Sequence, residues 1–493
     1  HILVYMFEVL YEIYSKCGYM DREIPRLIIE NNLHGLDIDD RAYQLACFSV
    51  VMKALEYNKR FLRSIEKEPL TLNLASIQET NRLTAEDIAF IAGVSSGEKY
   101  AKTKGFLEQF RDAKTIGSLL KINTHGMDVV QKRIEDIQSS PVSDLFQVGV
   151  RESALTLLPM LLKQTTIISN QYDILVTNPP YMGSGNMNSV LSEYLKKKYF
   201  VSKADLFAAF MELDHCIKKT GFYASVNQHS WMFLTSFEKL REKIIHNKTI
   251  ENMLHLGPRA FEEIGGEVVQ STAFTLRNYK VRDHKGVYIR LTEFKNTKEK
   301  IQKTIEAIKN PEVPYRFVCS MDKFFDIPGH PIAFWTSNAV SIIFKNSKTV
   351  GSFGETRIGM ATANNEGFLR FWYEVDFNNL ARECKSRDEA VNSKRKWFPY
   401  TKGGQFRKWY GNNDLVVNWK NDGYEIRNFK DEKTGRIRSH NYNLDYIFKP
   451  GLSWSAVSGY KFSLRIMDNS IIGSGGSAIV NINENNRMFL LGA

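Results

Sequence analysis

The chain has 493 residues, of which 43% are hydrophobic and 25% are charged, a balance that is typical of a folded protein and excludes a disordered one. Its apolar runs, such as 155–162, are far shorter than a membrane span, so we expect no membrane association. The net charge of +11 and the isoelectric point near 9.1 fit a polyanionic partner, and the length fits roughly two to four domains.

Strands that alternate with helices predict an α/β fold with a doubly wound sheet, whose ligand crevice lies at the carboxyl ends of the strands. Residues 84–170 show helical periodicity with Gly and Ser breaks, which indicates a helical insertion. Beyond about Pro328, short strand-like runs and Asn/Gly turns predict a separate α+β domain. The elements expected in the first part are a helix at the start of the chain, a strand over 33–39, a helix over 40–55, a sheet element over 70–77, a strand over 172–177, a helix over 205–219, a strand over 221–226, a helix over 237–245, and strands over 250–256 and 268–276.

The strand pattern at 172–177 runs directly into Asn178, Pro179, Pro180 and Tyr181, here called the NPPY corner. Each proline fixes its own φ and lacks an N–H, and a residue before a proline is kept out of the helical region. The corner is therefore expected to be stiff and extended. It offers the Asn178 amide oxygen and the Pro179 carbonyl as acceptors, without competing main-chain donors at the two prolines.

Two such acceptors suit a reaction at an amino nitrogen. The lone pair of an NH2 group on a heteroaromatic ring is delocalised, which makes the nitrogen a poor nucleophile. Acceptors on its two hydrogens pull the group toward tetrahedral geometry and free the lone pair, so the predicted chemistry is methyl transfer to that nitrogen. Tyr181 adds an aromatic face on which a planar, extruded base can stack. The alternative interpretation is a surface turn after a buried strand.

The cofactor side is less clearly marked. An acidic residue at the end of a second strand commonly accepts hydrogen bonds from a ribose, and Asp37 stands in that position within 35–39. A helix cap explains the neighbouring Asp39 equally well. A nucleoside cofactor also needs a glycine loop after the first strand, and the glycine-rich segment 473–477 is better interpreted as a turn of the last domain.

A basic stretch at 385–440 holds 14 basic and 7 acidic residues, a net charge of +7. Cations between flat rings suit phosphates and bases, although a solvated loop region is the alternative. The aromatic residues of this stretch are Trp397, Phe398, Tyr400, Phe406, Trp409, Tyr410 and Trp419.

The cysteines show no spacing typical of metal ligands, so we expect no metal site and interpret them as free thiols of a cytoplasmic protein. No export signal is visible in the segment that begins at His1. The five positions are Cys17, Cys47, Cys216, Cys319 and Cys384.

These residues resemble one family. The chain is similar to amino-group DNA methyltransferases of the adenine N6 type, above all to the PglX methyltransferases of BREX phage-defence systems and their type IIG restriction-modification relatives. Those enzymes carry Asp-Pro-x-x-Gly-Ser-Gly-His at their cofactor loop, and residues 1–4 resemble the segment directly after the last glycine of that motif. The missing loop is therefore expected just upstream. The other matching segments are 35–39, 178–183 and 204–210.

The resemblance implies S-adenosylmethionine as the cofactor, with Asp37 and the adjacent Ile38 in its binding site. Asn178 and Pro179 would hold the amino group of a flipped-out adenine in double-stranded DNA. Tyr181 and Phe261 would sandwich the base, unless Phe261 is a core residue beside a Gly-Pro turn.

The resemblance also implies a Rossmann-like methyltransferase domain over 1–325, with the insertion at 84–170. A target recognition domain would follow over 326–493, incomplete at its C-terminus. Other components of a phage-defence system are expected partners. Cleavage is not predicted from this chain, because the Asp-Glu-Lys run at 431–433 is interpreted as a polar turn rather than a catalytic cluster.

Two other functions fit parts of the sequence. Enzymes that methylate a glutamine amide in proteins use the same tetrapeptide, but they need no large basic second domain. A non-catalytic DNA-binding scaffold fits the missing glycine loop, and the chain as given is expected to bind duplex DNA but to hold the cofactor poorly. His229 is interpreted as structural, since a methylsulfonium donor needs no strong base.

Overall fold

The computed structural model describes residues 1–139, 145–261, 269–457 and 461–492, without the side chains of 145–147. The chain divides into two compact units, His1–Lys345 and Asn346–Ala493. The division lies later in the chain than the predicted domain boundary at 325.

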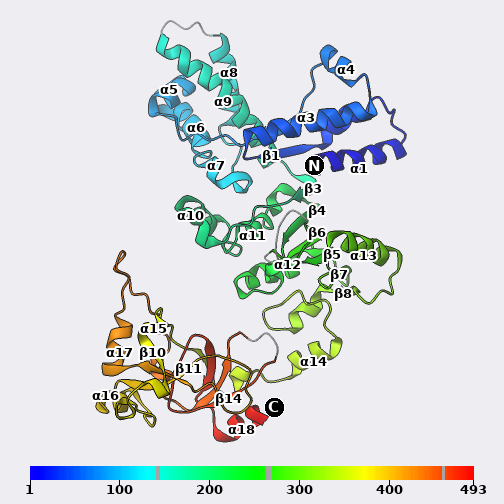
Figure 1. The fold of residues 1–493 in the computed structure, drawn as a ribbon. Coiled ribbons are helices and arrows are strands. Elements are labelled where there is room, and N and C mark those ends of the chain that lie inside the picture. The colour runs from blue at the N-terminus through cyan, green and yellow to red at the C-terminus, as the bar shows by residue number, and fades with distance from the viewer. Residues whose placement is uncertain (140–144, 262–268, 458–460, 493) are drawn as a thin grey trace. The chain divides into compact units, whose positions relative to one another are not determined.

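Helices and strands alternate along the first unit (Figure 1), and the predicted α/β class is confirmed. Its helices are α1 (Ile2–Lys16), α2 (Ile24–Leu27), α3 (Asp40–Tyr57), α4 (Phe61–Lys67), α5 (Ala85–Ala92), α6 (Gly97–Glu108), α7 (Ala113–Ile116), α8 (Met127–Ser139), α9 (Leu145–Ser169), α10 (Ser189–Lys198), α11 (Leu206–Phe210), α12 (Glu238–Asn247) and α13 (Thr297–Lys309), with α14 (Asn338–Asn346) ending at the division. Its strands are β1 (His34–Asp37), β2 (Asn73–Ser76), β3 (Tyr172–Thr177), β4 (Ile217–Gln228), β5 (Thr249–Gly257), β6 (Ser271–Arg277), β7 (Lys285–Arg290) and β8 (Arg316–Ser320).

Six of these strands form one mixed sheet in the order β3-β4-β6-β5-β7-β8, and β1 and β2 form a separate parallel pair. Strand β3 is parallel to β4, and β6 is antiparallel to both β4 and β5. Strand β7 is parallel to β5. The carboxyl ends of β3, β4, β5 and β7 therefore lie along one edge of the sheet, called here the carboxyl edge.

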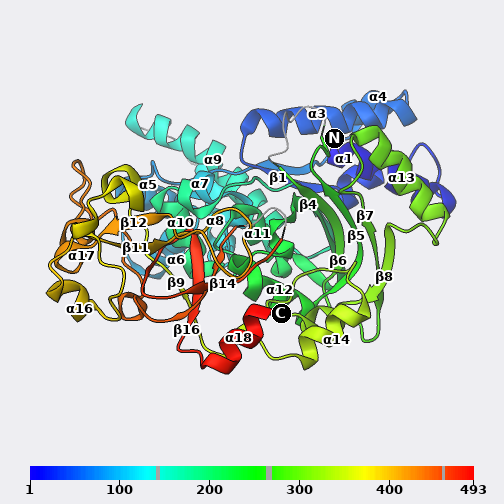
Figure 2. The same cartoon turned by 60° about the horizontal axis from the view of Figure 1, so that its bottom comes forward.

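The sheet is covered on both faces, as a doubly wound fold requires. Side chains alternate between the faces of a strand, so the neighbours Met253 and Leu254 of β5 point in opposite directions. Met253 belongs to a core that includes Leu240 and Ile244 of α12. Leu254 packs with Ala307 of α13 in a second core. Figures 1 and 2 show α12 and α13 on opposite sides of the strands.

The helix predicted over 205–219 is wrong. Helix α11 ends at Phe210, and β4 begins at Ile217. The reason is tertiary: Ile217 pairs with Tyr172 of β3, and the Asp214 carboxylate between the two elements accepts a salt bridge from Lys248, whose side chain is almost fully buried. Sheet pairing and this ion pair outweigh the helical periodicity of the sequence.

The described part of the predicted insertion is helical, and α5 to α9 contribute Phe106, Phe110 and Leu158 to a core that they share with Leu195 of α10 and Ala209 of α11. Its last helix contacts β1 and β2, and the amide N–H of Gln78 donates to the Gln164 side chain of α9 at 2.8 Å. The insertion is thereby fixed to the strand pair that ends in Asp37.

The second unit is α+β, as predicted, with two four-stranded sheets in the orders β10-β12-β11-β15 and β14-β13-β16-β9. Residues 473–475 form the turn between β15 and β16, and 476 and 477 begin β16, which confirms the interpretation of this segment as a turn of the last domain. The strands are β9 (Glu355–Ile358), β10 (Leu369–Phe371), β11 (Trp397–Thr401), β12 (Leu415–Asn418), β13 (Gly451–Ser455), β14 (Arg465–Met467), β15 (Ile471–Ile472) and β16 (Gly476–Val480), and the helices are α15 (Asn365–Phe368), α16 (Arg387–Asn392), α17 (Lys420–Arg427) and α18 (Glu484–Gly492).

Across the described ranges, no helix has both the length and the apolar character needed to cross a bilayer. All five cysteines are free thiols.

Candidate functional site

The NPPY corner lies at the carboxyl edge. Strand β3 pairs with β4 up to Thr177, which lies opposite Ser225, so Asn178 is the first residue beyond the paired segment. The Asn178 side chain is exposed, whereas Pro179 is buried. Within the described residues, no hydrogen bond occupies the Asn178 amide or the Pro179 carbonyl. The corner therefore offers two free acceptors on a backbone that the prolines and the sheet hold in place.

The residues directly after the corner are held by Asp205, the cap of α11. Its carboxylate accepts from the Met182 amide N–H at 3.0 Å and from the Phe207 amide N–H at 3.3 Å. The Leu206 amide N–H donates back to the Met182 carbonyl at 3.0 Å. Burial raises the pKa of Asp205, and the main-chain donors that it accepts from oppose this shift. Asp205 thus ties the corner to α11.

Tyr181 is half-buried and fixed at both ends of its side chain. Its hydroxyl donates to the Val226 carbonyl of β4 at 3.2 Å, and its ring meets the Phe207 ring edge to face at 6.0 Å between centroids. Burial raises the pKa of the Tyr181 hydroxyl, so the hydroxyl remains protonated and able to donate at neutral pH. The Tyr181 ring, three residues after Asn178, therefore has a defined orientation.

Phe261 ends the described segment after β5, at the same edge of the sheet. Its side chain is 42% exposed, so it is not a core residue. The turn before it is held by Lys300 of α13, which is buried and donates to the main-chain carbonyls of Leu256 and Pro258. The structure records no ring contact between Phe261 and Tyr181 within the described residues.

Asp37 ends β1 and is exposed. One oxygen of its carboxylate accepts from the Asp39 amide N–H at 2.9 Å, which leaves the other oxygen free to accept hydroxyl groups. The next residue, Ile38, is 46% exposed. The rings of His34 and Tyr172, the first residues of β1 and β3, lie 5.0 Å apart, so the strand that leads to Asp37 starts beside the strand that leads to Asn178.

A histidine pair at the carboxyl edge was not foreseen from the sequence. The Nδ1 atom of His229, just after β4, lies 2.9 Å from the Nε2 atom of His255 near the end of β5. Phe233 and Trp335 pack against the pair. Burial lowers the pKa of both rings, that of His255 to about 3. Both histidines are therefore neutral near pH 7, and His229 is part of a packed cluster.

A group of lysines around Phe200, called here the Phe200 patch, was also missed. Phe200 is 57% exposed, with the Nζ atoms of Lys203 and Lys239 at 4.1 and 5.3 Å from its ring centroid. Lys203 lies two residues before Asp205, next to the corner's anchor. No ion pair neutralises the patch lysines within the described residues. The sequence signal was the Lys-Lys-Lys run at 196–198, which is followed by Tyr199 and Phe200.

The aromatic residues of the basic stretch do not act as one surface. Phe398, Tyr400 and Trp419 are 0%, 3% and 1% exposed and belong to the core of the second unit, so their predicted role beside bases is wrong. They lie on β11 or just after β12, where alternate side chains point inward. Among the aromatic residues predicted for this role, Phe406, Trp409 and Tyr410 have largely exposed rings, and all three lie in the loop between these strands.

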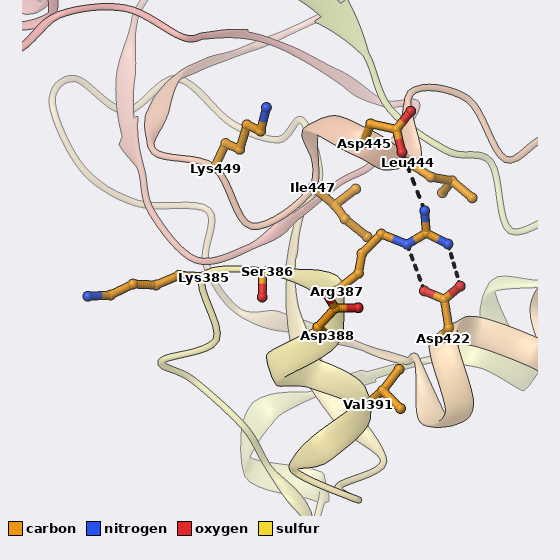
Figure 3. Close-up of a pocket in the computed structure, with 10 residues that line it drawn as sticks. All are labelled: Lys385, Ser386, Arg387, Asp388, Val391, Asp422, Leu444, Asp445, Ile447 and Lys449. Atoms are coloured by element: carbon orange, nitrogen blue, oxygen red, sulfur yellow. Dashed lines mark hydrogen bonds and ion pairs between the residues drawn. The ribbon is translucent and has the colours of Figure 1, made fainter.

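The second unit also contains a cavity of about 510 Å³ beside α16 (Figure 3). The Arg387 guanidinium forms a paired contact with the Asp422 carboxylate, with Nε and Oδ1 2.9 Å apart, and a contact with Asp445 at 3.4 Å. Figure 3 shows Lys385 and Lys449 pointing away from these ion pairs. Because the central charges neutralise one another, we interpret this cluster as a clamp that holds the left-handed turn at Asp422.

Comparison with known proteins confirms the resemblance that the sequence predicts. Residues 31–261 match the family of the Eco57I restriction-modification methylase. The chain is 40% identical over 471 residues to an adenine-specific methyltransferase PglX of Lacticaseibacillus casei (strain Zhang), which covers 94% of this chain and 38% of the relative. It is 36% identical over 505 residues to an adenine-specific methyltransferase BrxX of Escherichia coli O9:H4 (strain HS), covering 97% of this chain and 39% of the relative.

The chain thus spans less than half the length of these two curated relatives. Among solved structures, a nuclease-deletion mutant of the Type ISP restriction-modification enzyme LlaGI in complex with a DNA substrate mimic aligns over 99% of this chain and 39% of that one, at 11% identity and a TM-score of 0.47.

Replacing Asp205 by Ala is expected to loosen the corner, because the Met182 and Phe207 amides lose their acceptor. The loss of such a cap costs about 1–2 kcal/mol. Hydrogen exchange at Met182 should become faster, and Asp205→Asn, which keeps an acceptor oxygen, should restore slow exchange. The control is Asn296→Ala, which removes the cap of α13 and should leave exchange at Met182 unchanged; equal acceleration in both variants contradicts the anchor.

The histidine pair predicts a pH dependence of stability. Burial lowers the folded-state pKa of His255 to about 3, below its ordinary 6.5, so the unfolded chain takes up the proton first as the pH falls. The contribution of neutral His255 to the free energy of unfolding is complete above pH 6.5 and is lost toward pH 3. Within this range the free energy of unfolding falls by about 1.4 kcal/mol per pH unit. Denaturant unfolding of the chain between pH 7.5 and 5 should show a shallower dependence for His255→Asn than for the natural sequence. Identical slopes would exclude this role.

Proposed function

Since the chain is similar to adenine-specific methyltransferases, we propose that it methylates the N6 amino group of a flipped-out adenine in double-stranded DNA. The observation that carries this proposal is the NPPY corner at the carboxyl edge, with the Asn178 amide exposed and unoccupied while Pro179 and Tyr181 are held by the fold. A surface turn without function needs neither the Asp205 anchor nor a fixed aromatic ring beside it.

The corner's chemistry follows from its two acceptors. The Asn178 oxygen and the Pro179 carbonyl each take one hydrogen of the adenine amino group, and the nitrogen lone pair turns toward the methyl donor. The nitrogen would accept the methyl group that a bound methylsulfonium donor would supply with cleavage of its carbon–sulfur bond, and the surplus proton would pass to water. The ring of Tyr181 stacks on the base and fixes its plane, with Phe261 on the opposite face. His229 has no part in this proposed transfer, because its Nδ1 atom faces the His255 ring at 2.9 Å and Phe233 packs against it.

We assign S-adenosylmethionine to the side of the sheet at Asp37. The free carboxylate oxygen of Asp37 suits the two hydroxyl groups of a ribose, and the exposed Ile38 offers an apolar surface to the adenine of the cofactor. When bound, the cofactor supplies the activated methyl group. The neighbouring strands leave this side open: among described strands, β1 pairs only with β2 and β3 only with β4. A glycine-loop strand between β1 and β3 would complete the site.

Double-stranded DNA fits the charged surfaces of both units. The Phe200 patch carries lysines beside the corner's anchor, where phosphates flanking an extruded base would lie. The second unit, as a target recognition domain, would add sequence readout. A role in phage defence or restriction-modification, alongside other components of such a system, is part of the same proposal. Cationic surfaces of this kind argue against a glutamine amide in a protein as the substrate.

A non-catalytic DNA-binding role is the second candidate for this chain taken by itself. The observation that favours it is the edge of β3, which pairs with no described strand other than β4 and whose Ile174 and Val176 are 54% and 38% exposed. An incomplete cofactor site leaves DNA binding intact but prevents methyl transfer.

Replacing Asn178 by Ala is expected to reduce methylation by about 10²- to 10³-fold, because one of two acceptors that activate the amine is lost. Affinity for duplex DNA should change less than about twofold. Methylation is measured on duplex DNA with a form of the protein extended upstream to include a cofactor loop. His229→Ala serves as the control and should retain methylation; an active Asn178→Ala variant would refute the assignment of the corner.

The present chain is expected to show no saturable binding of S-adenosylmethionine in calorimetric titration, whereas the form extended upstream binds it. The reason is the open side of the sheet between β1 and β3. Asp37→Ala in the extended form should weaken cofactor binding while leaving DNA affinity unchanged. Tight binding by the present chain would show that no further strand is needed.

A further inference from the structure

The hairpin loop between β11 and β12, residues 402–414, is unusually long for a connection between paired strands. Tyr400 of β11 lies opposite Leu415 of β12, so the loop leaves and re-enters the same sheet. Structureless loops longer than about 12 residues in compact domains are generally functional or disordered. The contacts of the main chain distinguish these two possibilities here.

The main chain of the loop is fixed at two points by neighbouring strands. The Gly404 amide N–H donates to the Ser455 hydroxyl at 3.0 Å, and that hydroxyl lies 2.9 Å from the Gly404 carbonyl. Farther along, the Trp409 amide N–H donates to the Leu464 carbonyl at 3.0 Å, and the Ile466 amide N–H donates to the Trp409 carbonyl at 2.8 Å. The loop is therefore an ordered element.

A third contact closes the loop across itself. The Asn412 side-chain amide donates to the Gln405 carbonyl at 3.1 Å. At its base, Gly403 lies so close to the turn at 473–477 that a Cβ atom would stand 1.9 Å from the Gly475 carbonyl oxygen. Only glycine permits this approach of two main chains, which sets the loop against the second sheet.

The backbone of Trp409 is strained. Its φ of +67° is in the left-handed region, which a bulky residue rarely adopts, and the bonds to Leu464 and Ile466 hold it there. Packing of the ring in the core does not compensate for this strain, because Trp409 is 59% exposed. Strain that places a large ring in solvent is typical of a binding site.

The side chains of the loop are free where its main chain is fixed. Phe406 and Tyr410 are 46% and 70% exposed. The Gln405 amide and the Arg407 guanidinium are exposed, and no side-chain hydrogen bond or ion pair occupies either within the described part of the chain. A hollow of about 220 Å³ separates the loop from Phe371 of β10. The loop thus combines fixed geometry with unused donors, acceptors and rings.

The charge beneath the loop is positive. Arg465 lies opposite Trp409, is 1% exposed and has no carboxylate partner among the described residues. Among the described residues, its guanidinium donates only to hydroxyl groups, those of Ser463 and Ser455, at 3.4 Å each, and its Nε atom has no hydrogen-bond partner. A buried cation without an anion is costly and favours a polyanion that approaches the loop.

We propose that the loop 402–414 reads base identity in a groove of the DNA. This proposal rests on the proposed function and names the element that sets its sequence specificity. Arg407 is suited to a guanine edge and Gln405 to an adenine edge, each through two hydrogen bonds. Trp409 and Tyr410 pack against sugars and bases and fix the depth of the loop in the groove.

The first test selects preferred sequences from a pool of random duplex DNA with the 493-residue chain. Gln405→Ala and Arg407→Ala should each lower discrimination at one base pair by about 10- to 100-fold, because a paired contact to a base edge is lost. The matched control is the double variant Lys433→Ala, Arg436→Ala, which removes two exposed cations from the same basic stretch. It should weaken binding to all sequences alike and lower the salt dependence, with the preferred sequence unchanged.

The second test separates recognition from structure. Trp409→Gly relieves the left-handed strain, so the melting temperature of the second unit should stay the same or rise. Affinity for the preferred duplex should nevertheless fall by about tenfold or more. Tyr424→Ala on α17, which removes a ring 67% exposed, should change neither quantity.

Each outcome separates this inference from the proposed function. Loop variants that keep the natural preference, or a Trp409→Gly variant that loses stability and keeps affinity, would overturn the reading role and leave DNA methylation standing. A chain that binds duplex DNA without any sequence preference would do the same. A chain that binds no duplex DNA would overturn both.

Discussion

The Asp205 carboxylate is the interaction on which the candidate site depends. It joins the residue directly after the NPPY corner to the first turn of α11, and α11 in turn places Phe207 against Tyr181. The prolines make the corner stiff, but stiffness alone does not aim it. The orientation of the corner is set by the Asp205 carboxylate, which accepts from the amides of Met182 and Phe207, and by the parallel pairing of β3 with β4.

The two units use the same physical arrangement for different tasks. At the corner and in the loop 402–414, the main chain is held by hydrogen bonds to neighbouring elements while selected side chains remain unoccupied. Such groups lose little freedom when a ligand arrives, so less of the binding energy is spent on ordering them. In the proposed function, Asn178 presents one acceptor for an amine, and in the proposed readout Arg407 and Gln405 present complementary groups for base edges. Rigid backbone and free side chains thus unite the proposed chemistry and the proposed readout.

Features set by local stereochemistry could be predicted from the sequence. The strand before Asn178 and the stiff prolines depend on near neighbours alone, so they are found where expected. Features set by distant partners could not. The helix expected over 205–219 is interrupted because Ile217 joins the sheet, and the pair of His229 with His255 joins residues 26 positions apart. The composition of the basic stretch likewise placed Trp419 among the rings that contact bases. Its side chain is buried in the core, because burial depends on how the strand packs in the fold.

Strand β3 leads to the NPPY corner, and its outer edge is also a site where the protein can aggregate. Among the described strands it pairs only with β4, so its outer side offers amide and carbonyl groups without strand partners, and the exposed Ile174 and Val176 add apolar surface. Such a border is a template for any strand that meets it, including the same strand of a second molecule. The one charge within it, on Asp173, is held in a salt bridge to Lys218 and protects little. Self-association of the isolated chain would therefore begin at the strand that delivers Asn178, and aggregation and loss of the site would occur together.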